Sequence, residues 1–328
     1  MSDGNVTIIV DSANVTINAN NGNVTIKDVE YKNYGKCKVI SNGLIEMYVT
    51  TEIGPRIIKL NLCGKENLMF NDIDRAMAED ISAVFGENKK WYIYGGHRLW
   101  VSPEAANTYY PDNDPVAITI NGSSVVFTPP PQEVNNLQHS MEITMCADKP
   151  CAYVTHKVIN VGDEEMTGAI WALSVMTDGG TVICPQPDED TKLLGNRILA
   201  LWPYTRMTDD RAHFFDKYIT MKQDKACDEK FKFGINNTKG WIAYQNHGQI
   251  LKKTYEPNHP NGNYPDFGCS TEAFTNHLFA EAETLSELKT LKKGEFIVHT
   301  ERFELIEAPD INVTCQTELE AYVDKYIL

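Results

Sequence analysis

Apolar and polar residues alternate with a period of two over most of the sequence between residues 31 and 306. This alternation is typical of β-strands with one buried face, and Gly, Asn and Pro between the segments indicate turns. Asn-Gly at 42–43 and Asn-Gly-Ser at 121–123 predict hairpin connections. The predicted strands are 36–40, 44–50, 56–62, 116–120, 125–128, 141–146, 152–160, 167–176, 241–244, 250–255, 278–284 and 296–306.

Helical periodicity is scarce in comparison. Residues 72–84 predict one short helix. Residues 317–328 predict another, with one face made of Leu319, Tyr322, Val323, Tyr326 and Ile327. Many short strands with regular turns favour a sandwich over an alternating β-α array, and no linker rich in Pro, Gly or Ser divides the chain. We therefore expect an all-β fold, with one large antiparallel β-sandwich domain at residues 31–328.

An internal repeat occupies residues 1–30. Asn-Val-Thr-Ile begins at Asn5, Asn14 and Asn23, with a spacing of nine residues, and each unit alternates β-branched and polar residues between turn formers. The repeat predicts short strands, which we treat as an N-terminal segment apart from the main domain. An edge ribbon, a contact between copies in a homo-oligomer and a leader all remain open for it.

Charge and cysteine content narrow the functional classes. The 328 residues carry 45 acidic and 30 basic side chains, a formal charge of −15 and a pI near 5.0. This balance argues against a nucleic-acid surface and against binding to anionic membranes. No signal peptide pattern and no apolar run of 18 residues is visible. The eight cysteines lie far apart without a CxxC pair, so we expect free thiols and a cytoplasmic protein.

The stretch 94–104 concentrates reactive side chains. Two glycines free the backbone for a tight turn or a close approach, and His97, which can titrate near neutral pH, follows them. Arg98, Trp100 and Glu104 add a clamp for an anion or hydroxyl, an apolar platform and a second acid. Bulk packing does not need this mixture, which makes the stretch a candidate site.

A second candidate lies near the C-terminus, where Glu281 and Glu283 occupy positions i and i+2 of a predicted strand. Their side chains share one face, and burying two carboxylates together is costly, so we expect that face to meet solvent or a cleft. Arg56 is either a charge at a strand end or a ligand clamp.

Other site classes lack their sequence signatures. The chain contains no phosphate-binding loop, no dinucleotide-binding fingerprint, no nucleophile elbow and no HExxH motif. His97, His139 and His156 match no metal-ligand spacing. We expect neither a cofactor nor a metal.

Four segments, taken together, resemble the galactose mutarotase (aldose 1-epimerase) superfamily. They are the strand pair 54–68, the strand and turn Asn-Val-Gly-Asp-Glu at 160–164, the glutamate on a strand at 281, and the closing Lys-Gly-Glu turn and strand at 293–301. Gly-Gly-His-Arg-Leu-Trp at 95–100, with Gly-Gly at 179–180 and Trp-Pro-Tyr at 202–204, resembles a bacterial branch of that superfamily. The resemblance covers residues 31–306.

The resemblance implies a twisted β-supersandwich with a sugar cleft across one concave sheet. By position, Glu281 matches the family's catalytic base, Arg56 its early arginine and His97 its early histidine. The family's acid histidine normally follows the 160–164 turn, but residues 168–176 contain no histidine. Either His97 takes over the acid role, or the activity differs from ordinary mutarotation.

Three functions follow for a small-molecule carbohydrate ligand. The first is an aldose 1-epimerase-like isomerase that opens the sugar hemiacetal, with Glu281 as base and His97 as acid. Arg56, Arg98, Trp100, Glu104 and Glu283 would then bind the substrate. The second is a carbohydrate-binding domain without turnover. The third is a lyase or hydrolase for an acidic glycan, with Arg56, Arg98 and Arg206 reading a carboxylate or phosphate.

Overall fold

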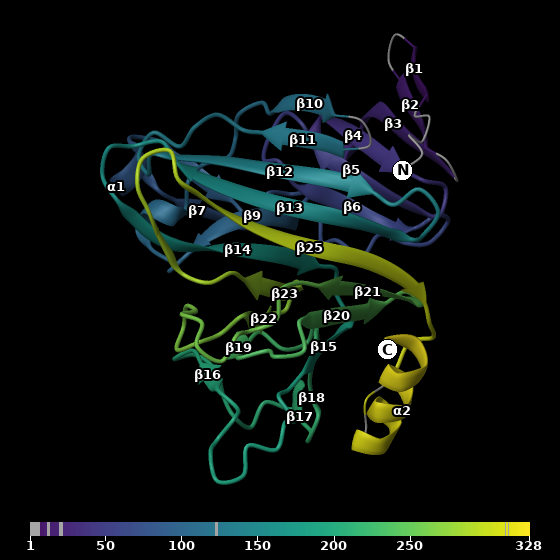
Figure 1. Ribbon diagram of the computed structural model, residues 1–328, viewed down its shortest axis with the longest axis vertical. Helices are drawn as coiled ribbons and strands as arrows, with labels where there is room; N and C mark the ends of the chain where they lie inside the picture. The colour runs from purple at the N-terminus through teal and green to yellow at the C-terminus, as the bar shows by residue number, and fades with distance from the viewer. Residues whose placement is uncertain (1–6, 12–13, 20–21, 122–123, 312, 314) are drawn as a thin grey trace, which may run out of the picture.

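The computed structural model describes residues 7–11, 14–19, 22–121, 124–311, 313 and 315–328. In this part of the chain, two large antiparallel β-sheets pack against each other around a shared apolar core (Figure 1). The all-β prediction is confirmed.

The larger sheet contains 13 strands in the described chain. In spatial order they are β1 (Thr7–Asp11), β2 (Asn14–Ala19), β3 (Gly22–Glu30), β4 (Lys36–Ser41), β5 (Ile45–Thr50), β6 (Ile57–Leu62), β9 (Gly96–Ser102), β14 (Met166–Met176), β23 (Ala280–Leu285), β22 (Thr271–Thr275), β19 (Phe231–Ile235) and β16 (Leu199–Leu201), with β24 (Lys289–Leu291) beside β14.

The second sheet has ten strands among the described residues. Their order is β10 (Ala117–Asn121), β11 (Ser124–Thr128), β12 (Leu137–Met145), β13 (Cys151–Asn160), β25 (Phe296–Glu307), β21 (Gln249–Thr254), β20 (Trp241–Asn246), β15 (Thr181–Pro185), β18 (Tyr218–Lys222) and β17 (Ala212–Phe214). A separate ribbon pairs β7 (Ala78–Asp80) with β8 (Lys90–Tyr92).

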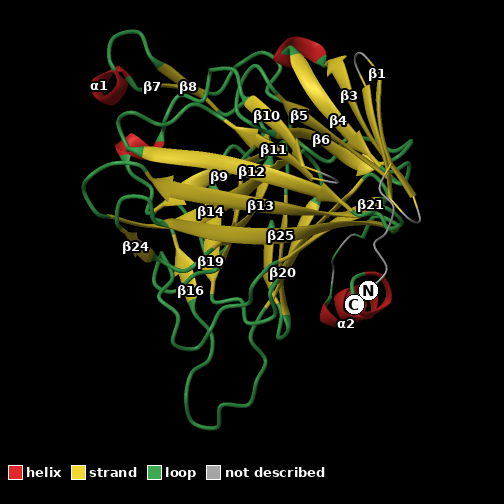
Figure 2. Ribbon diagram, turned by 45° about the horizontal axis from the view of Figure 1, so that its top comes forward, coloured by secondary structure: helices red, strands yellow, loops and turns green. Residues whose placement is uncertain are grey.

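Helices contribute little and lie at the periphery (Figure 2). They are α1 (Ser82–Phe85), α2 (Gln316–Tyr326) and the 3-10 turns η1 (Lys32–Tyr34) and η2 (Ala106–Thr108). The C-terminal helix is confirmed, and Leu319 and Val323 pack it against Ile183 and Trp241 of the second sheet. The prediction of a helix over 72–84 is wrong except for its last turn, because β7 takes residues 78–80 into the ribbon.

Period-two burial explains why the alternating segments form strands. In β12 every second side chain is buried, and β25 shows the same alternation over most of its length. Each strand predicted from alternation is present. Strands such as β15, β18, β19 and β22 were not predicted, because neighbours cover both of their faces and their sequences do not alternate.

The strands of the N-terminal repeat extend the larger sheet. β1, β2 and β3 pair in sequence, and β3 pairs with β4 over six residues. Val24 and Ile26 of β3 belong to the main core, so the third repeat unit is packed onto the domain that it precedes. The first copy of the repeat begins at Asn5, outside the described residues.

One disulfide departs from the cysteine prediction. The hairpin between β12 and β13 brings Cys146 and Cys151 to a Cα–Cα separation of 5.5 Å, within the range that a disulfide spans, and the two are bonded. The expectation of eight free thiols is wrong for this pair. The free cysteines of the described chain are Cys37, Cys63, Cys184, Cys227, Cys269 and Cys315. Among the described residues, no helix combines the length and apolarity needed to cross a membrane.

Candidate functional site

The outer face of the larger sheet carries five charged side chains on four strands. They are Arg98 of β9, Glu281 and Glu283 of β23, Glu272 of β22 and Lys232 of β19, and we call this set the charged face. Each is buried, although the face points away from the sandwich core. A buried charge is stable only when it is compensated, so the contacts of this set decide its chemistry.

Strand register brings the charged face together. Arg98 pairs with Leu173 of β14, which pairs with Glu283. Glu283 pairs in turn with Glu272. Directly opposed residues in a sheet share a face, so these side chains form one row across it. Glu281 lies in the next row, opposite Phe274.

Lys232 compensates two of the three glutamates. Its ammonium lies 2.7 Å from Glu272 Oε2 and 3.0 Å from Glu283 Oε2. Burial lowers the pKa of Lys232, but Glu272 and Glu283 outweigh burial and raise it well above its ordinary value. Trp171 donates its Nε1–H to Glu283 Oε2 at 2.7 Å. Glu283 is therefore held in place by two neighbours, the Lys232 ammonium and the Trp171 ring.

Glu281 differs from its neighbour because it has no such ion pair among the described residues. Burial, and next to it the charge of Glu283, raise the pKa of Glu281 to about 8, against the opposing charges of Arg98 and Lys232. A carboxyl with this pKa exchanges its proton near neutral pH, as an acid–base catalyst must. Glu281 is thus a titrating group of the charged face, where burial also raises the pKa of Glu272 well above its ordinary value.

His97 lies on the other side of the same sheet. It pairs with Ser174, which pairs with Ala282, so its side chain points into the sandwich while Glu281 points out. The sequence placed His97 and Glu281 on two walls of one cleft, and the structure does not bring them together. His97 is also fully buried, and burial lowers its pKa well below the ordinary value, which contradicts the expectation of titration near neutral pH.

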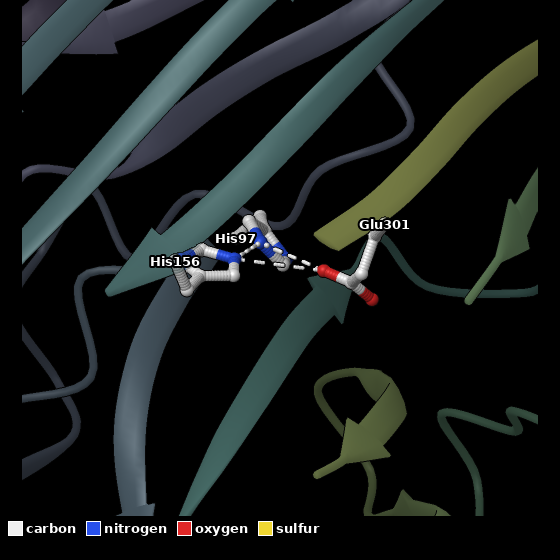
Figure 3. Close-up of side chains that lie close together, drawn as sticks. All are labelled: His97, His156 and Glu301. Atoms are coloured by element: carbon white, nitrogen blue, oxygen red, sulfur yellow. Dashed lines mark hydrogen bonds and ion pairs between the residues drawn. The ribbon is translucent and has the colours of Figure 1, made fainter. Parts of the chain in front are cut away.

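His97 belongs to a polar network between the two sheets (Figure 3). Its Nε2 lies 2.8 Å from His156 Nε2 and 3.3 Å from Glu301 Oε2, and its Nδ1 lies 2.8 Å from Ser174 Oγ. Lys253 Nζ approaches Glu301 Oε1 at 2.8 Å. Within the core, one ammonium thus balances one carboxylate beside two imidazoles.

His97, His156 and Glu301 are residue types that bind zinc, and their ligand atoms all lie within 4.8 Å of one another. The two Nε2 atoms, however, are separated by a hydrogen-bond distance of 2.8 Å, whereas two nitrogens on a tetrahedral zinc ion lie about 3.3 Å apart. Lys253 already neutralises Glu301. We therefore interpret the cluster as a hydrogen-bonded, charge-balanced network.

Comparison with known protein-family models gives no match, and comparison with curated protein sequences gives none either. Comparison with solved structures gives several matches. A proposed aldose 1-epimerase from Klebsiella pneumoniae superposes with a TM-score of 0.58 at 10% identity, covering 98% of this chain and 95% of that one. A galactose mutarotase-like protein from Lactobacillus casei superposes with a TM-score of 0.52 at 11% sequence identity, covering 82% of this chain and 99% of that one. The protein has the galactose mutarotase-like fold.

The galactose mutarotase-like fold also occurs within a longer chain. A TPR-domain containing protein from Parabacteroides distasonis matches 95% of this chain with a TM-score of 0.58 and 12% identity. The present chain spans only 56% of that protein. At these identities the comparisons establish the fold, and the chemistry must be argued from the residues of this chain.

The two arginines predicted as clamps have different surroundings within the galactose mutarotase-like fold. Arg56 donates through Nη2 to both oxygens of Asp112, at 3.0 and 2.8 Å, and through Nη1 to the Ile93 carbonyl. Arg98 has no carboxylate within ion-pair distance in the described chain, and its guanidinium contacts the rings of Trp91 and Trp100, at 4.9 and 4.2 Å from their centroids. Burial lowers the pKa of Arg98 to about 10, so it stays cationic at neutral pH.

Two other predicted residues lie at the edge of the charged face. Trp100 is buried in an aromatic cluster with Trp171, so it is no open platform. Glu104 lies exposed on the loop after β9, where it accepts a hydrogen bond from the Tyr109 hydroxyl. Its charge still raises the pKa of Glu281, which places it near that carboxyl.

Glu281 and Glu283 share a face, as predicted. That face is closed to open solvent, because Glu283 is fully buried and Glu281 is only 8% exposed. A cleft that reaches Glu281 stays a prediction. Lys232 was not predicted, although a lysine between Phe231 and Phe233 in a buried strand is itself a signal for a buried counter-ion.

Glu301 and Lys253 of the internal network were missed in the same way. Both occupy inward positions of alternating strands, where an apolar residue is the rule. Opposite charges at such positions predict a buried ion pair, but which pair forms depends on the packing of two strands that are adjacent only in the folded sheet.

Proposed function

We propose that the protein binds a carbohydrate at the charged face and interconverts its anomers, with Glu281 as the group that transfers the proton. The observation that carries the proposal is the surroundings of Glu281. The Glu281 carboxyl is buried and has no ion pair among the described residues, and burial together with the neighbouring Glu283 raises its pKa to about 8. The fold shared with mutarotase-like proteins supports the choice of a sugar as ligand.

Ring opening of a sugar hemiacetal requires one proton to leave the anomeric hydroxyl and one to reach the ring oxygen. With a pKa of about 8, Glu281 is mostly protonated at pH 7. Its hydroxyl donates to the ring oxygen while its other oxygen accepts the anomeric proton, and the bond between the ring oxygen and the anomeric carbon breaks. The carboxyl ends the step protonated on its other oxygen, so no second acid is needed. Positioned acid–base groups supply roughly 10²–10⁴-fold for such transfers.

Aromatic surface for the sugar comes from the loop between β16 and β17. Tyr204 is 40% exposed, and its pKa responds to Lys232, Glu283 and Glu281, which places it beside the charged face. Trp202 stacks over the Lys232 ammonium at 4.5 Å. Rings of this kind cover the apolar face of a pyranose while their polar atoms hydrogen-bond.

The test is mutarotation of α-D-glucose, α-D-galactose and further aldoses, followed by polarimetry or by NMR saturation transfer. We expect the wild type to accelerate the reaction for at least one aldose, and Glu281→Gln to lower the rate by about 100-fold or more. Glu66→Gln is the matched control, because that glutamate is exposed. Full activity of Glu281→Gln, or no acceleration of any aldose by the wild type, would refute the proposal.

A second candidate is carbohydrate binding without turnover. It is favoured by one observation, the position of His97 on the far side of the sheet from Glu281, which leaves the proposed reaction dependent on a single carboxyl. Saturable sugar binding by calorimetry, together with an unaccelerated rate, would identify this function.

A further inference from the structure

One cavity of the molecule lies beside Arg98 and does not include Glu281. It measures about 60 Å³ and is lined by Arg98 and Trp100 of β9, Arg56 before β6, His139 of β12, and the loops 108–114 and 129–132. One buried water needs about 10–15 Å³ of such space, so the cavity holds a group of several heavy atoms but no sugar ring. We call it the donor pocket.

The side chains of the donor pocket leave nitrogen donors unpaired. Arg98 Nε and Nη1, Arg56 Nε, Trp100 Nε1 and His139 Nε2 are buried and have no hydrogen-bond partner in the part of the chain that the structure describes. Gln132 Nε2 lies 3.4 Å from His139 Nδ1 and donates to it, so the neutral ring carries its proton on Nε2.

Unpaired buried donors are rare in proteins, because each has lost its hydration without gaining a hydrogen bond. All five belong to residues that line one small cavity, and together they favour a ligand that accepts hydrogen bonds. These donors are already desolvated in the protein without ligand. A ligand that accepts hydrogen bonds from them therefore gains nearly the full strength of each hydrogen bond.

The charged side chains of the donor pocket indicate whether its ligand is an anion or a cation. Asp112 neutralises Arg56 through Nη2, and Asp114, which also lines the cavity, is exposed to solvent. Arg98 is buried, contacts the rings of Trp91 and Trp100, and has no carboxylate within ion-pair distance in the described chain. A buried cation without a counter-ion is costly, and an anionic ligand removes that cost.

We propose that the donor pocket binds an oxyanion group, a carboxylate or a phosphoryl group, so that the protein's ligand is an acidic carbohydrate. Arg98 and Trp100 belong to the pocket, and Arg98 also to the charged face, which joins the two sites. The anion site stands on its own geometry, while the carbohydrate part of the ligand rests on the proposed function.

Isothermal titration calorimetry with D-glucose, D-glucuronate, D-glucose 6-phosphate and inorganic phosphate tests the inference. We expect the wild type to bind at least one acidic sugar about tenfold or more tightly than glucose, as charged hydrogen bonds predict. Glucuronate and glucose 6-phosphate distinguish the carboxylate from the phosphoryl group. Arg98→Met should abolish the preference, and Lys293→Met, which removes one positive charge from an exposed ion pair with Asp163, should keep it.

Trp100→Phe is a second variant, which keeps an aromatic ring and removes only the Nε1 donor. It should weaken the acidic sugar several-fold without weakening glucose equally, which keeps the test decisive if Arg98→Met fails to fold. Acidic sugars that bind no tighter than glucose, or a preference that survives in Arg98→Met, would overturn the inference.

The two proposals fail differently. Acceleration of glucose mutarotation without preference for an acidic sugar overturns the oxyanion site alone. Binding of inorganic phosphate that is lost in Arg98→Met, together with no sugar binding or turnover, overturns the proposed function and keeps the anion site. Absence of binding and of turnover with every probe overturns both.

Discussion

Replacement of Glu281 by Gln should change how the stability of the protein depends on pH. Glu281 has a pKa of about 8 in the folded protein and an ordinary value of 4.5. Between these two values the folded state retains a proton that the unfolded state has lost. The free energy of unfolding contributed by this carboxyl is therefore fully present below pH 4.5 and falls as pH rises towards 8, by about 1.4 kcal/mol per unit.

The glutamine variant lacks this titration. The free energy of unfolding of Glu281→Gln, minus that of the wild type, should therefore increase by about 3 kcal/mol between pH 5 and pH 7.5. Other groups titrate in both proteins, and subtraction removes most of their contribution. A glutamine also keeps the size of the side chain, so packing changes little.

Urea denaturation followed by tryptophan fluorescence, at half-unit steps of pH, measures this difference. Glu66→Gln is the control, because the Glu66 carboxyl is exposed and its neutralisation leaves no buried group without a partner. A difference between Glu281→Gln and the wild type that stays constant from pH 5 to 7.5 would refute the raised pKa and, with it, the acid–base role of Glu281.

Two further predictions concern buried ion pairs, and urea denaturation tests both. Lys232→Met should destabilise the protein by about 3–5 kcal/mol, because it leaves Glu283 and its neighbour buried without a cation, and a loss below about 1 kcal/mol would contradict the ion pairs. Lys253→Met and Glu301→Met should each cost a similar amount, while the double variant should cost clearly less than their sum. Additive losses in that cycle would show that the two side chains do not interact.

The fold class could be predicted from the amino-acid sequence. Alternation with a period of two is a local property, because it follows from the geometry of a single strand with one buried face. It located β12, β13 and β25 and placed Glu281 and Glu283 on one face. It did not locate β15 or β19, because strands covered on both faces have no alternation to detect.

Only the tertiary structure decided which reactive side chains meet. His97 and Arg98 are adjacent in sequence, yet strand geometry sends one into the core beside His156 and the other to the charged face near Glu281. The pairing of β9 with β14 sets which side chains of β9 face the core, and no local sequence pattern encodes that register. Charge compensation is equally non-local, since Lys232 reaches Glu283 across two strand pairings. Most of the reactive residues could be predicted from the sequence, but the register of the sheet determines which of them lie together.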